Sequence, residues 1–212
     1  MRIAELSEQS GAPVATIKFY LREGLLAAGQ RSNPTQASYD ATHLRRLRLI
    51  QALREVGGLS LARIRVLTDA IDDDRLPTHD MLGLAANEVS PEVSADPDDP
   101  AVAASQARIE RLVADRGWAL SADNPGWRTA VRVLANFEQV GAGELLEVLD
   151  SYAQAAEIVA EADLGTVLNG PDPASRVETV VVGTVLGDSL FAALRRMAQE
   201  SMSRKFFPPS GE

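Results

Sequence analysis

The chain has 212 residues, of which 45% are hydrophobic and none is cysteine, and its formal net charge is −9. Such a chain can bury one large core or two modest ones, whereas the lack of cysteine excludes disulfides, thiolate metal sites, iron–sulfur clusters and cysteine redox switches. The longest apolar runs, such as residues 180–182, are far shorter than the roughly 20 residues of a membrane helix, and no signal-peptide pattern is present. We therefore expect a soluble, cytoplasmic protein without a membrane contact.

Two short helices are predicted at the N-terminus. Ile3 and Leu6 stand at helical spacing, and Gly11 ends this first helix. The second helix starts after Pro13, where the missing amide hydrogen costs nothing, and it ends at Gly24. A helix, a turn and a second amphipathic helix in this order are the layout of a helix–turn–helix, whose second helix fits the DNA major groove.

A small β wing and two further helices are predicted next. Residues 25–39 are rich in Gly, Asn, Pro, Ser and Gln, which is typical of a hairpin or loop. Asp40 and Ser60 are good N-caps for the two helices, of which the first closes at 57–58 and the second before the acidic run 72–74. The segment 1–74 therefore forms the first predicted domain.

The rest of the chain is predicted to be helical. Residues 75–100 contain four prolines, which leave room for one short helix and an acidic linker. Four helices then follow in 101–212, beginning near residues 100, 125, 143 and 173. The predicted fold class is mainly α, with an N-terminal winged helix–turn–helix and a C-terminal all-helical domain.

The charge is divided unevenly along the chain. Residues 1–70 carry ten Lys or Arg against six Asp or Glu, a net charge of +4, whereas residues 71–212 carry eleven against twenty-four, a net charge of −13. A basic first third joined to an acidic remainder is typical of a nucleic-acid-binding module attached to a module with another role.

The polar face of the second helix carries the first candidates for DNA contact. They are Thr16, Lys18, Phe19 and Arg22, with Tyr20 beside them. Lys and Arg pair with guanine acceptors or phosphates, and an aromatic ring can pack on a sugar or a thymine methyl. On spacing alone, an ordinary solvated face with Tyr20 in the core explains the pattern equally well.

The segment KFYLREGLL, followed by a wing and YDATHLRRLRLIQALREVGGLSLARIRVL, closely resembles the DNA-binding domain of MerR-family transcription regulators over about residues 1–71. The resemblance implies that Lys18 and Phe19 contact the phosphate backbone and groove, with Tyr20 at the boundary between protein and DNA. It also implies a phosphate contact by Arg54.

The chain departs from the family pattern at two places. Pro13 and Ala15 stand where family members usually have Ser or Thr and often Arg, so one base-reading contact is expected to be missing. The wing keeps only the final aromatic residue of the usual run, Tyr39, and Arg31 is the nearby basic candidate for phosphate contact.

The resemblance also implies a homodimer on double-stranded promoter DNA. Family members pair through a long helix after the DNA-binding domain, but the prolines at 91, 97 and 100 forbid a continuous helix over 80–116. The C-terminal domain is therefore expected to share in the dimer interface. By resemblance, the dimer would twist and bend a promoter until its elements come into register for RNA polymerase.

Aromatic residues of the C-terminal domain are candidates to line an apolar ligand pocket. They are Trp118, Trp127, Phe137, Tyr152 and Phe191, and ordinary core packing is the competing interpretation. A neutral or cationic organic effector would suit the acidic half. A regulator without a ligand is an open alternative.

No motif for catalysis, a cofactor or a metal is present. The two histidines, His43 and His79, stand apart, and His43 is expected on the surface. Calcium loops, phosphate-binding loops and serine elbows are absent from the sequence. We expect no enzyme. The alternative to a regulator is an interaction protein whose acidic helical domain is the active part, which the N-terminal module docks on DNA or polymerase.

Overall fold

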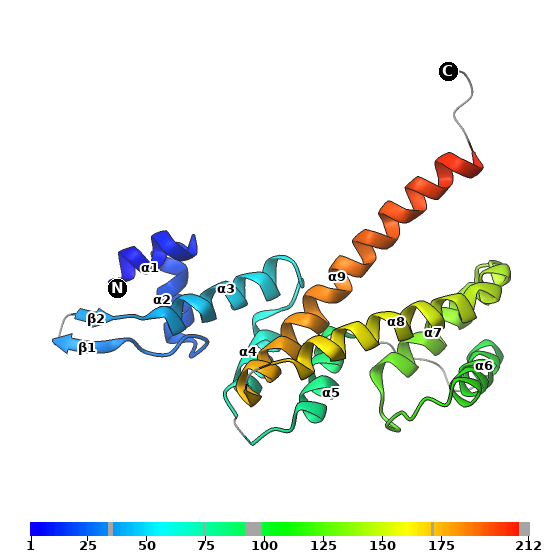
Figure 1. The fold of residues 1–212 in the computed structure, drawn as a ribbon, viewed down its shortest axis with the longest axis horizontal. Coiled ribbons are helices and arrows are strands. Elements are labelled where there is room, and N and C mark those ends of the chain that lie inside the picture. Colours follow the sequence, from blue (N-terminus) through cyan, green and yellow to red (C-terminus); the bar gives the residue numbers. More distant parts are fainter. Residues whose placement is uncertain (34–35, 74, 92–98, 171, 208–212) are drawn as a thin grey trace. The chain divides into compact units, whose positions relative to one another are not determined.

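The protein is mainly helical, which confirms the predicted fold class (Figure 1). The computed structural model describes residues 1–33, 36–73, 75–91, 99–170 and 172–207, without the side chains of 31–33, 36 and 173–174. In chain order, the elements are α1 (Ile3–Ser10), α2 (Val14–Arg22), β1 (Gln30–Asn33), β2 (Gln36–Ser38), α3 (Ala41–Glu55), α4 (Leu61–Ile71), α5 (Thr78–Val89), α6 (Pro100–Arg116), α7 (Pro125–Gln139), the 3₁₀ helix η1 (Gly143–Val148), α8 (Leu149–Leu168) and α9 (Pro173–Phe206).

The chain divides into two compact units, and each is described by itself. Residues 1–74 and 182–212 form the first, called here the N-terminal unit, and residues 75–181 form the second, called the central unit. Helix α9 contributes its first turns to the central unit and its remaining turns to the N-terminal unit. The later turns of α9 thus belong to the same compact unit as residues 1–74.

A tight turn joins α1 to α2. Gly11 ends α1 in the left-handed conformation with a φ of 71°, which a residue with a side chain adopts only under strain. Pro13 then leads into α2 with the φ that a helix start requires. Leu6 from α1 and Ile17 and Tyr20 from α2 are buried, and the two helices form the predicted helix–turn–helix.

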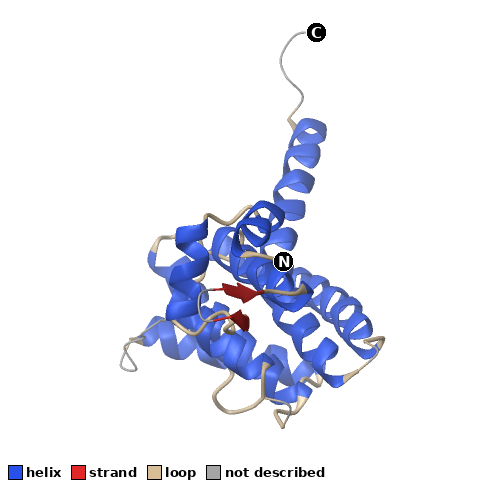
Figure 2. Cartoon of the chain, turned by 90° about the vertical axis from the view of Figure 1, so that its left-hand side faces the viewer, coloured by secondary structure: helices blue, strands red, loops and turns tan. Residues whose placement is uncertain are grey.

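The wing is a two-stranded antiparallel hairpin, drawn red in Figure 2. Arg31 pairs with Ala37, and the register shifts between residues 31 and 33. At the base of the hairpin, the amino group of Met1 donates a hydrogen bond to the carbonyl oxygen of Tyr39 at 2.6 Å, and the amide of Tyr39 donates to the carbonyl oxygen of Met1 at 2.8 Å. These two bonds fasten the wing to the start of α1.

Asp40 caps α3, as its position predicts. Its carboxylate accepts hydrogen bonds from the backbone amides of Thr42 at 3.0 Å and of His43 at 3.3 Å, and also from the hydroxyl of Thr42. It lies 2.7 Å from Nδ1 of His43. The Thr42 hydroxyl above all, and His43 after it, hold the pKa of Asp40 well below its usual value, because they stabilise the ionised carboxylate.

His43 is buried, so the prediction of a surface position was wrong. Only 8% of the residue is exposed, and its ring meets the ring of Tyr39 edge-on, with 5.2 Å between the centroids. Its Nε2 atom is buried and has no hydrogen-bond partner within the described residues. The side chain turns inward because Asp40 and Tyr39 hold it from both sides. His43 therefore joins the wing to α3.

The core of the N-terminal unit uses residues from all four of its leading helices. Ile64 and Leu67 of α4 point inward, as predicted, whereas Val56 is exposed because α3 ends before it. Fully buried in this unit are Leu6, Ile17, Leu47, Ile50, Leu53, Ile64 and Leu67. Burial of this many large side chains drives the folding of a segment of this size.

Helix α9 packs against the turn between α3 and α4. A Cβ atom at Gly57 would lie only 2.3 Å from Cγ1 of Val185, so the helix could not approach this closely if residue 57 had a side chain. Ser189 donates a hydrogen bond from its hydroxyl to the carbonyl oxygen of Val56 at 3.3 Å. Gly57 therefore makes room for α9, whereas Gly58 supplies the left-handed φ of 68° in this turn.

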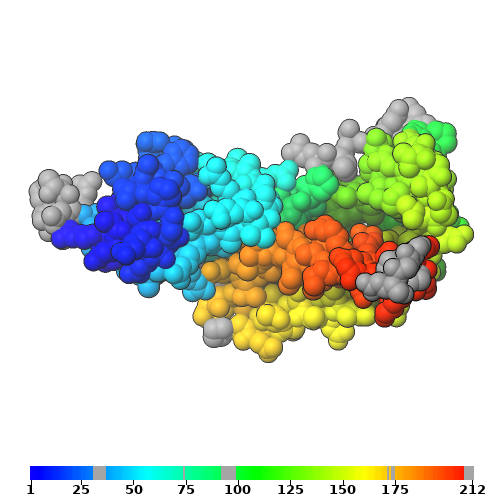
Figure 3. Space-filling model, turned by 90° about the horizontal axis from the view of Figure 1, so that it is seen from above, coloured from blue at the N-terminus to red at the C-terminus, as the bar shows by residue number. Residues whose placement is uncertain are grey.

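Helix α9 is also the one helix among the described residues that is long and apolar enough to cross a membrane. By length and composition alone it could cross a membrane, since an 18-residue window within Ser175–Phe206 has a mean hydropathy of 1.6, and 22% of that window is buried. In Figure 3 this helix, coloured orange to red, lies at the surface. The prediction from sequence rests on unbroken apolar runs. It does not detect this helix because Gly, Thr and Ser interrupt its apolar residues. One such helix is weak support for a membrane span.

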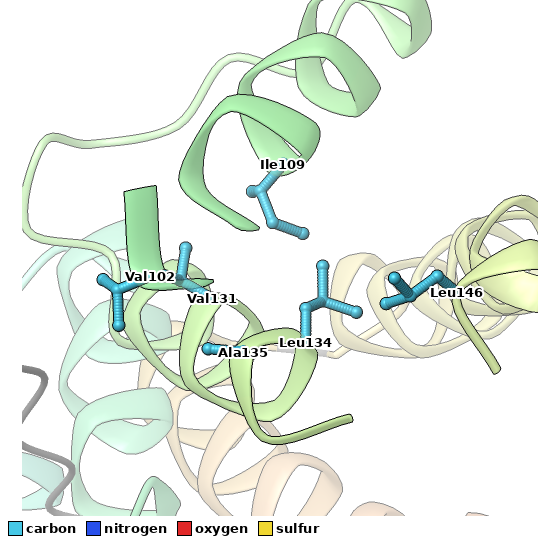
Figure 4. Close-up of a cluster of buried hydrophobic side chains, with 6 residues drawn as sticks. All are labelled: Val102, Ile109, Val131, Leu134, Ala135 and Leu146. Carbon is cyan, nitrogen blue, oxygen red and sulfur yellow. The ribbon is translucent and has the colours of Figure 1, made fainter. Parts of the chain in front are cut away.

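The core of the central unit lies where α6, α7 and η1 meet (Figure 4). The sequence predicts the inward positions of Val102 and Ile109 in α6 and of Val131 and Leu134 in α7, and all four are buried there. The proline break before α6 is also present, since α5 ends at residue 89 and α6 begins at residue 100.

The segment 143–148 differs from the prediction. A single α-helix was expected from residue 143, but η1 precedes α8 and shifts the inward position by one residue. Leu146 is therefore buried with α6 and α7, whereas Leu145, which the spacing of a continuous helix from residue 143 predicts on the inward face, is exposed. A short 3₁₀ segment is a common start for an α-helix, and periodicity alone does not reveal it.

Candidate functional site

One face of α2 is solvated and positively charged. Lys18 and Arg22 lie one turn apart, and both are exposed. Thr16 and Phe19 are half-buried at the edges of this face, and Ile17 is buried on the opposite side. The anchored side of the helix therefore holds the cationic side toward solvent, as a recognition helix requires.

Arg22 is held in place without being buried. Its guanidinium carbon lies 5.5 Å from the centre of the Phe19 ring, within the range of a cation–π contact, and 71% of its side chain is exposed. Its Nε lies 3.8 Å from Glu23, whose carboxylate also lies 3.5 Å from Arg65. Two arginines thus balance the negative charge of Glu23 at the end of this face.

Lys18 has a different environment. Within the described part of the chain, no hydrogen bond, ion pair or ring contact holds its ammonium group. An exposed ammonium without a partner can bind a phosphate oxygen without first breaking an internal contact. Lys18 and Arg22 together are therefore the strongest anion-binding pair on α2.

Two of the predicted contact residues lie inside the core. Tyr20 is only 2% exposed and Tyr39 only 8% exposed, so neither ring can stack on a sugar or a base. Tyr20 is a core residue, which is one of the two interpretations that its spacing in the sequence allows. Its hydroxyl accepts a hydrogen bond from Nη1 of Arg54 at 3.4 Å, and Arg54 itself is exposed. Tyr20 therefore positions Arg54 at the surface.

The wing contains one predicted contact residue, Arg31, of which the structure describes the backbone alone. Arg31 lies in β1 and pairs with Ala37, but its side chain is outside the described residues. A phosphate contact by Arg31 remains a prediction from the sequence.

Sequence reasoning missed the arginines that brace this unit. Arg48 donates from Nη2 to the carbonyl oxygen of Gln9 at 3.1 Å, and Arg46 donates from Nη1 to the carbonyl oxygen of Thr68 at 3.3 Å. Arg46 also pairs with Asp72. Their partners are backbone atoms or side chains far away in the chain, so no local motif could reveal them.

The central unit contains an apolar pocket of about 330 Å³. Trp118, Trp127 and Tyr152 line it, together with aliphatic residues of α6, α7 and α8. Two predicted residues do not line this pocket. Phe137 packs against the core cluster instead, and Phe191 lies in the exposed part of α9 within the N-terminal unit.

An ion-pair network holds one wall of this pocket. Trp118 donates from its indole Nε1 to Glu157 at 2.8 Å, and Arg116 donates from Nη1 to the same carboxylate at 2.9 Å. Arg116 also donates from Nη2 to the carbonyl oxygen of Asp150 at 3.0 Å. Arg116 also pairs with the exposed carboxylate of Asp150 at 3.3 Å, so Trp118 is oriented by Glu157 within a three-residue ion-pair network.

The described residues do not form a metal site. No group of three or more His, Asp or Glu side chains in that part of the chain could hold a metal ion. His79 is exposed in α5 of the central unit, and His43 belongs to the N-terminal unit.

The N-terminal segment matches known regulatory proteins. The sequence model of the MerR HTH family regulatory proteins matches residues 1–71. The nodulation protein NolA of Bradyrhizobium elkanii is 44% identical over 64 residues, and NolA of Bradyrhizobium sp. (strain NC92) is 41% identical over 68 residues. These matches span 30% and 32% of this chain but only 29% and 28% of the two NolA proteins, so the likeness to NolA concerns the first domain.

A solved structure extends the likeness to the whole chain. SCO5550 from Streptomyces coelicolor A3(2), a protein assigned as a transcriptional regulator, is 35% identical, with 100% of both chains covered and a TM-score of 0.76. Both the helix–turn–helix and the helical remainder are thus similar to those of one regulator. The protein described here belongs to the MerR family and is a DNA-binding transcriptional regulator.

Proposed function

We propose that the protein binds promoter DNA as a homodimer through the cationic face of α2, and that a small organic effector modulates this binding. In this proposal residues 1–74 are the DNA-binding domain, 75–100 a connecting segment, and 101–212 the helical domain for dimerisation and effector binding. The observation that carries it is the exposed pair Lys18 and Arg22 on a helix whose opposite side is anchored in the core.

The contacts of α2 support distinct roles for its residues. Lys18 would bind a phosphate, since its ammonium is exposed and has no partner within the described residues. Arg22 is exposed and held over Phe19, so it would reach a base edge or a phosphate at a low cost in conformational entropy. Thr16 would add a polar contact, and Arg54, held by Tyr20, would bind the flanking backbone.

The two lysines of the chain make a direct test of this interface. Lys18 and Lys205 are both exposed, and Lys205 lies in the last turn of α9. We expect duplex DNA to protect Lys18 from acetylation by an amine-reactive reagent and to leave Lys205 reactive, as read by mass spectrometry. Equal reactivity of Lys18 with and without bound DNA would contradict the proposal, as would an affinity that does not fall with salt, which would favour the interaction-protein alternative.

A homodimer is supported by the exposed face of α9. Residues 187, 190, 194, 197 and 201 recur at the alternating spacing of three and four that forms a coiled-coil seam. Leu190, Leu194 and Met197 occupy its centre and are 61%, 51% and 66% exposed in the single chain. Large apolar side chains in such a row mark an interface. A second copy would cover them and would place two α2 helices on one operator.

Binding to promoter DNA implies where such a protein acts in the cell and which partners it meets. It would act in the cytoplasm, and it would influence RNA polymerase indirectly through the twist and bend of the bound promoter. The apolar character of α9 would then serve the dimer rather than a lipid bilayer. The pocket of the central unit would receive the effector, which shifts the dimer between two shapes.

A further inference from the structure

Both tryptophans of the chain line the same pocket. The sequence contains only Trp118 and Trp127, and both border the 330 Å³ cavity of the central unit together with Tyr152. This volume lies near the lower end of the range for small-molecule sites. Aromatic side chains favour planar ring systems, on which they stack or which they meet edge-on. The shape and lining of the cavity therefore fit a flat molecule of about two or three rings.

The lining also selects for the charge of that molecule. Of the lining residues that the structure describes, none is ionisable at neutral pH, and the remainder are mostly aliphatic. The carboxylate of Glu157, which accepts the hydrogen bond of Trp118, is already paired with Arg116. A charged ligand would lose its hydration among lining side chains that carry no charge, which is costly.

One polar group of the pocket remains available. Asn124 uses its side-chain oxygen to accept the backbone amide of Trp127 at 3.1 Å, and it thereby caps α7. The indole Nε1 of Trp127 makes no hydrogen bond within the part of the chain that the structure describes, and it is open to solvent and not sealed in the core. An indole N–H is a donor only, so it would pair with an acceptor such as a carbonyl oxygen on the ligand.

We propose that this pocket binds an uncharged, planar aromatic molecule of about two or three rings that carries a hydrogen-bond acceptor. This names the chemical class of the effector and so rests on the proposed function, but binding itself can be measured without DNA. The acceptor pairs with Trp127, and Trp118, held by Glu157, forms a fixed aromatic wall.

The test uses the fluorescence of the full-length protein, because all of its tryptophan emission comes from this pocket. The probe is prodan, an uncharged naphthalene with a carbonyl group. We expect prodan to quench the tryptophan emission in a saturable way. We expect anilinonaphthalene sulfonate, an anionic naphthalene, and a cationic styrylpyridinium dye to bind at least about tenfold more weakly, since each would have to bury a charge.

Two matched alanine variants separate the pocket from other apolar surfaces of the protein. Ala156 lines the pocket, whereas Ala160 lies one turn further along α8, is exposed and does not line the pocket. Leucine is a good helix former at both positions. Ala156→Leu should weaken prodan binding by about tenfold or more because it fills the cavity, and Ala160→Leu should leave it unchanged. Trp127→Phe should weaken binding and remove the spectral shift of a hydrogen-bonded prodan carbonyl.

Each outcome decides between the two proposals. Failure of prodan to quench, equal binding of the charged dyes, or equal effects of Ala156→Leu and Ala160→Leu would overturn the pocket proposal. A gel-shift assay with duplex DNA on the same preparations tests the DNA-binding role separately. Saturable, variant-sensitive prodan binding without DNA binding would sink the proposed function alone, whereas normal DNA binding without prodan binding would sink this inference alone.

Discussion

Helix α2 of the N-terminal unit and the helices of the central unit expose opposite kinds of surface. In the N-terminal unit, α2 buries its large apolar side chains and exposes cations such as Lys18 and Arg22. In the central unit, an apolar hollow remains unfilled, and α8 exposes large apolar side chains such as Ile158 and Leu168. Helix α2 therefore presents charge to solvent, whereas the pocket and α8 present apolar surface that the core of the central unit does not use, as does the exposed face of α9 in the N-terminal unit.

The difference predicts how each unit responds to conditions. Binding through exposed cations weakens steeply with salt, because counterions compete for the phosphates. Binding through apolar surface is nearly insensitive to salt of ordinary concentration. Substitutions that place a charge on an apolar face should therefore have the largest effects on binding.

The strongest expected effect is on the apolar face of α9. Leu194→Lys should weaken dimerisation by about a hundredfold or more, because two copies of the lysine would be buried without partners at the seam. Sedimentation or light scattering would measure the loss. Gln199→Lys, the same charge on the opposite side of the helix, is the control and should stay dimeric. A dimer that survives Leu194→Lys would show that α9 is not the seam.

The second effect concerns the cationic face of α2. Lys18→Ala should lower the affinity for duplex DNA of any sequence by about tenfold and reduce the salt dependence of binding, because one phosphate contact is lost. Fluorescence anisotropy at several salt concentrations would measure both. Lys205→Ala removes the only other lysine of the chain and should change neither. An affinity unchanged in Lys18→Ala would remove Lys18 from the interface.

A smaller effect tests whether the two units are separately stable. Ser60 caps α4 in the N-terminal unit, and Asn124 caps α7 in the central unit, each through a side-chain oxygen that accepts a backbone amide. Replacing either with Ala should cost about 1 kcal/mol of folding free energy. Hydrogen exchange of each unit would show the loss in the mutated unit alone. Equal losses in both units after either change would mean that they unfold together.

The smallest effect is a pH dependence that belongs to the N-terminal unit. Because hydrogen bonds from Thr42 and His43 lower the pKa of Asp40 in the folded state, the unfolded state takes up its proton first as the pH falls. The stabilisation is thus complete at neutral pH and is lost progressively below pH about 4. Asp40→Asn keeps a capping side chain without the charge. Its thermal stability should therefore fall less than that of the wild type on acidification, and parallel curves would refute this role.

Much of the fold could be predicted because its signals are local. Gly11, Pro13 and the caps at Asp40 and Ser60 set helix ends through contacts with residues no more than a few positions away. The face of α2 that carries Lys18 was predicted for the same reason. Such features depend on helical spacing and capping, both of which are readable in a single sequence.

The features that were missed depend on distant partners. His43 is buried because the wing brings Tyr39 against it, and Phe191 lies outside the pocket because its part of α9 belongs with the N-terminal unit. The start of η1 also moved Leu146 into the core in place of Leu145. A residue's type and spacing indicate that it is apolar or aromatic, but they do not determine which neighbours it meets.

The contact between Gly57 and Val185 has a consequence for how the protein is made. The ribosome delivers the turn at residues 57–58 long before it delivers the helix that covers it. The helix–turn–helix must therefore hold together on its own core during synthesis and gain this neighbour only after Ser189 has been added to the chain. A premature stop codon after residue 181 would leave residues 1–74 intact. It would nevertheless remove the part of α9 that packs on their turn at residues 57–58.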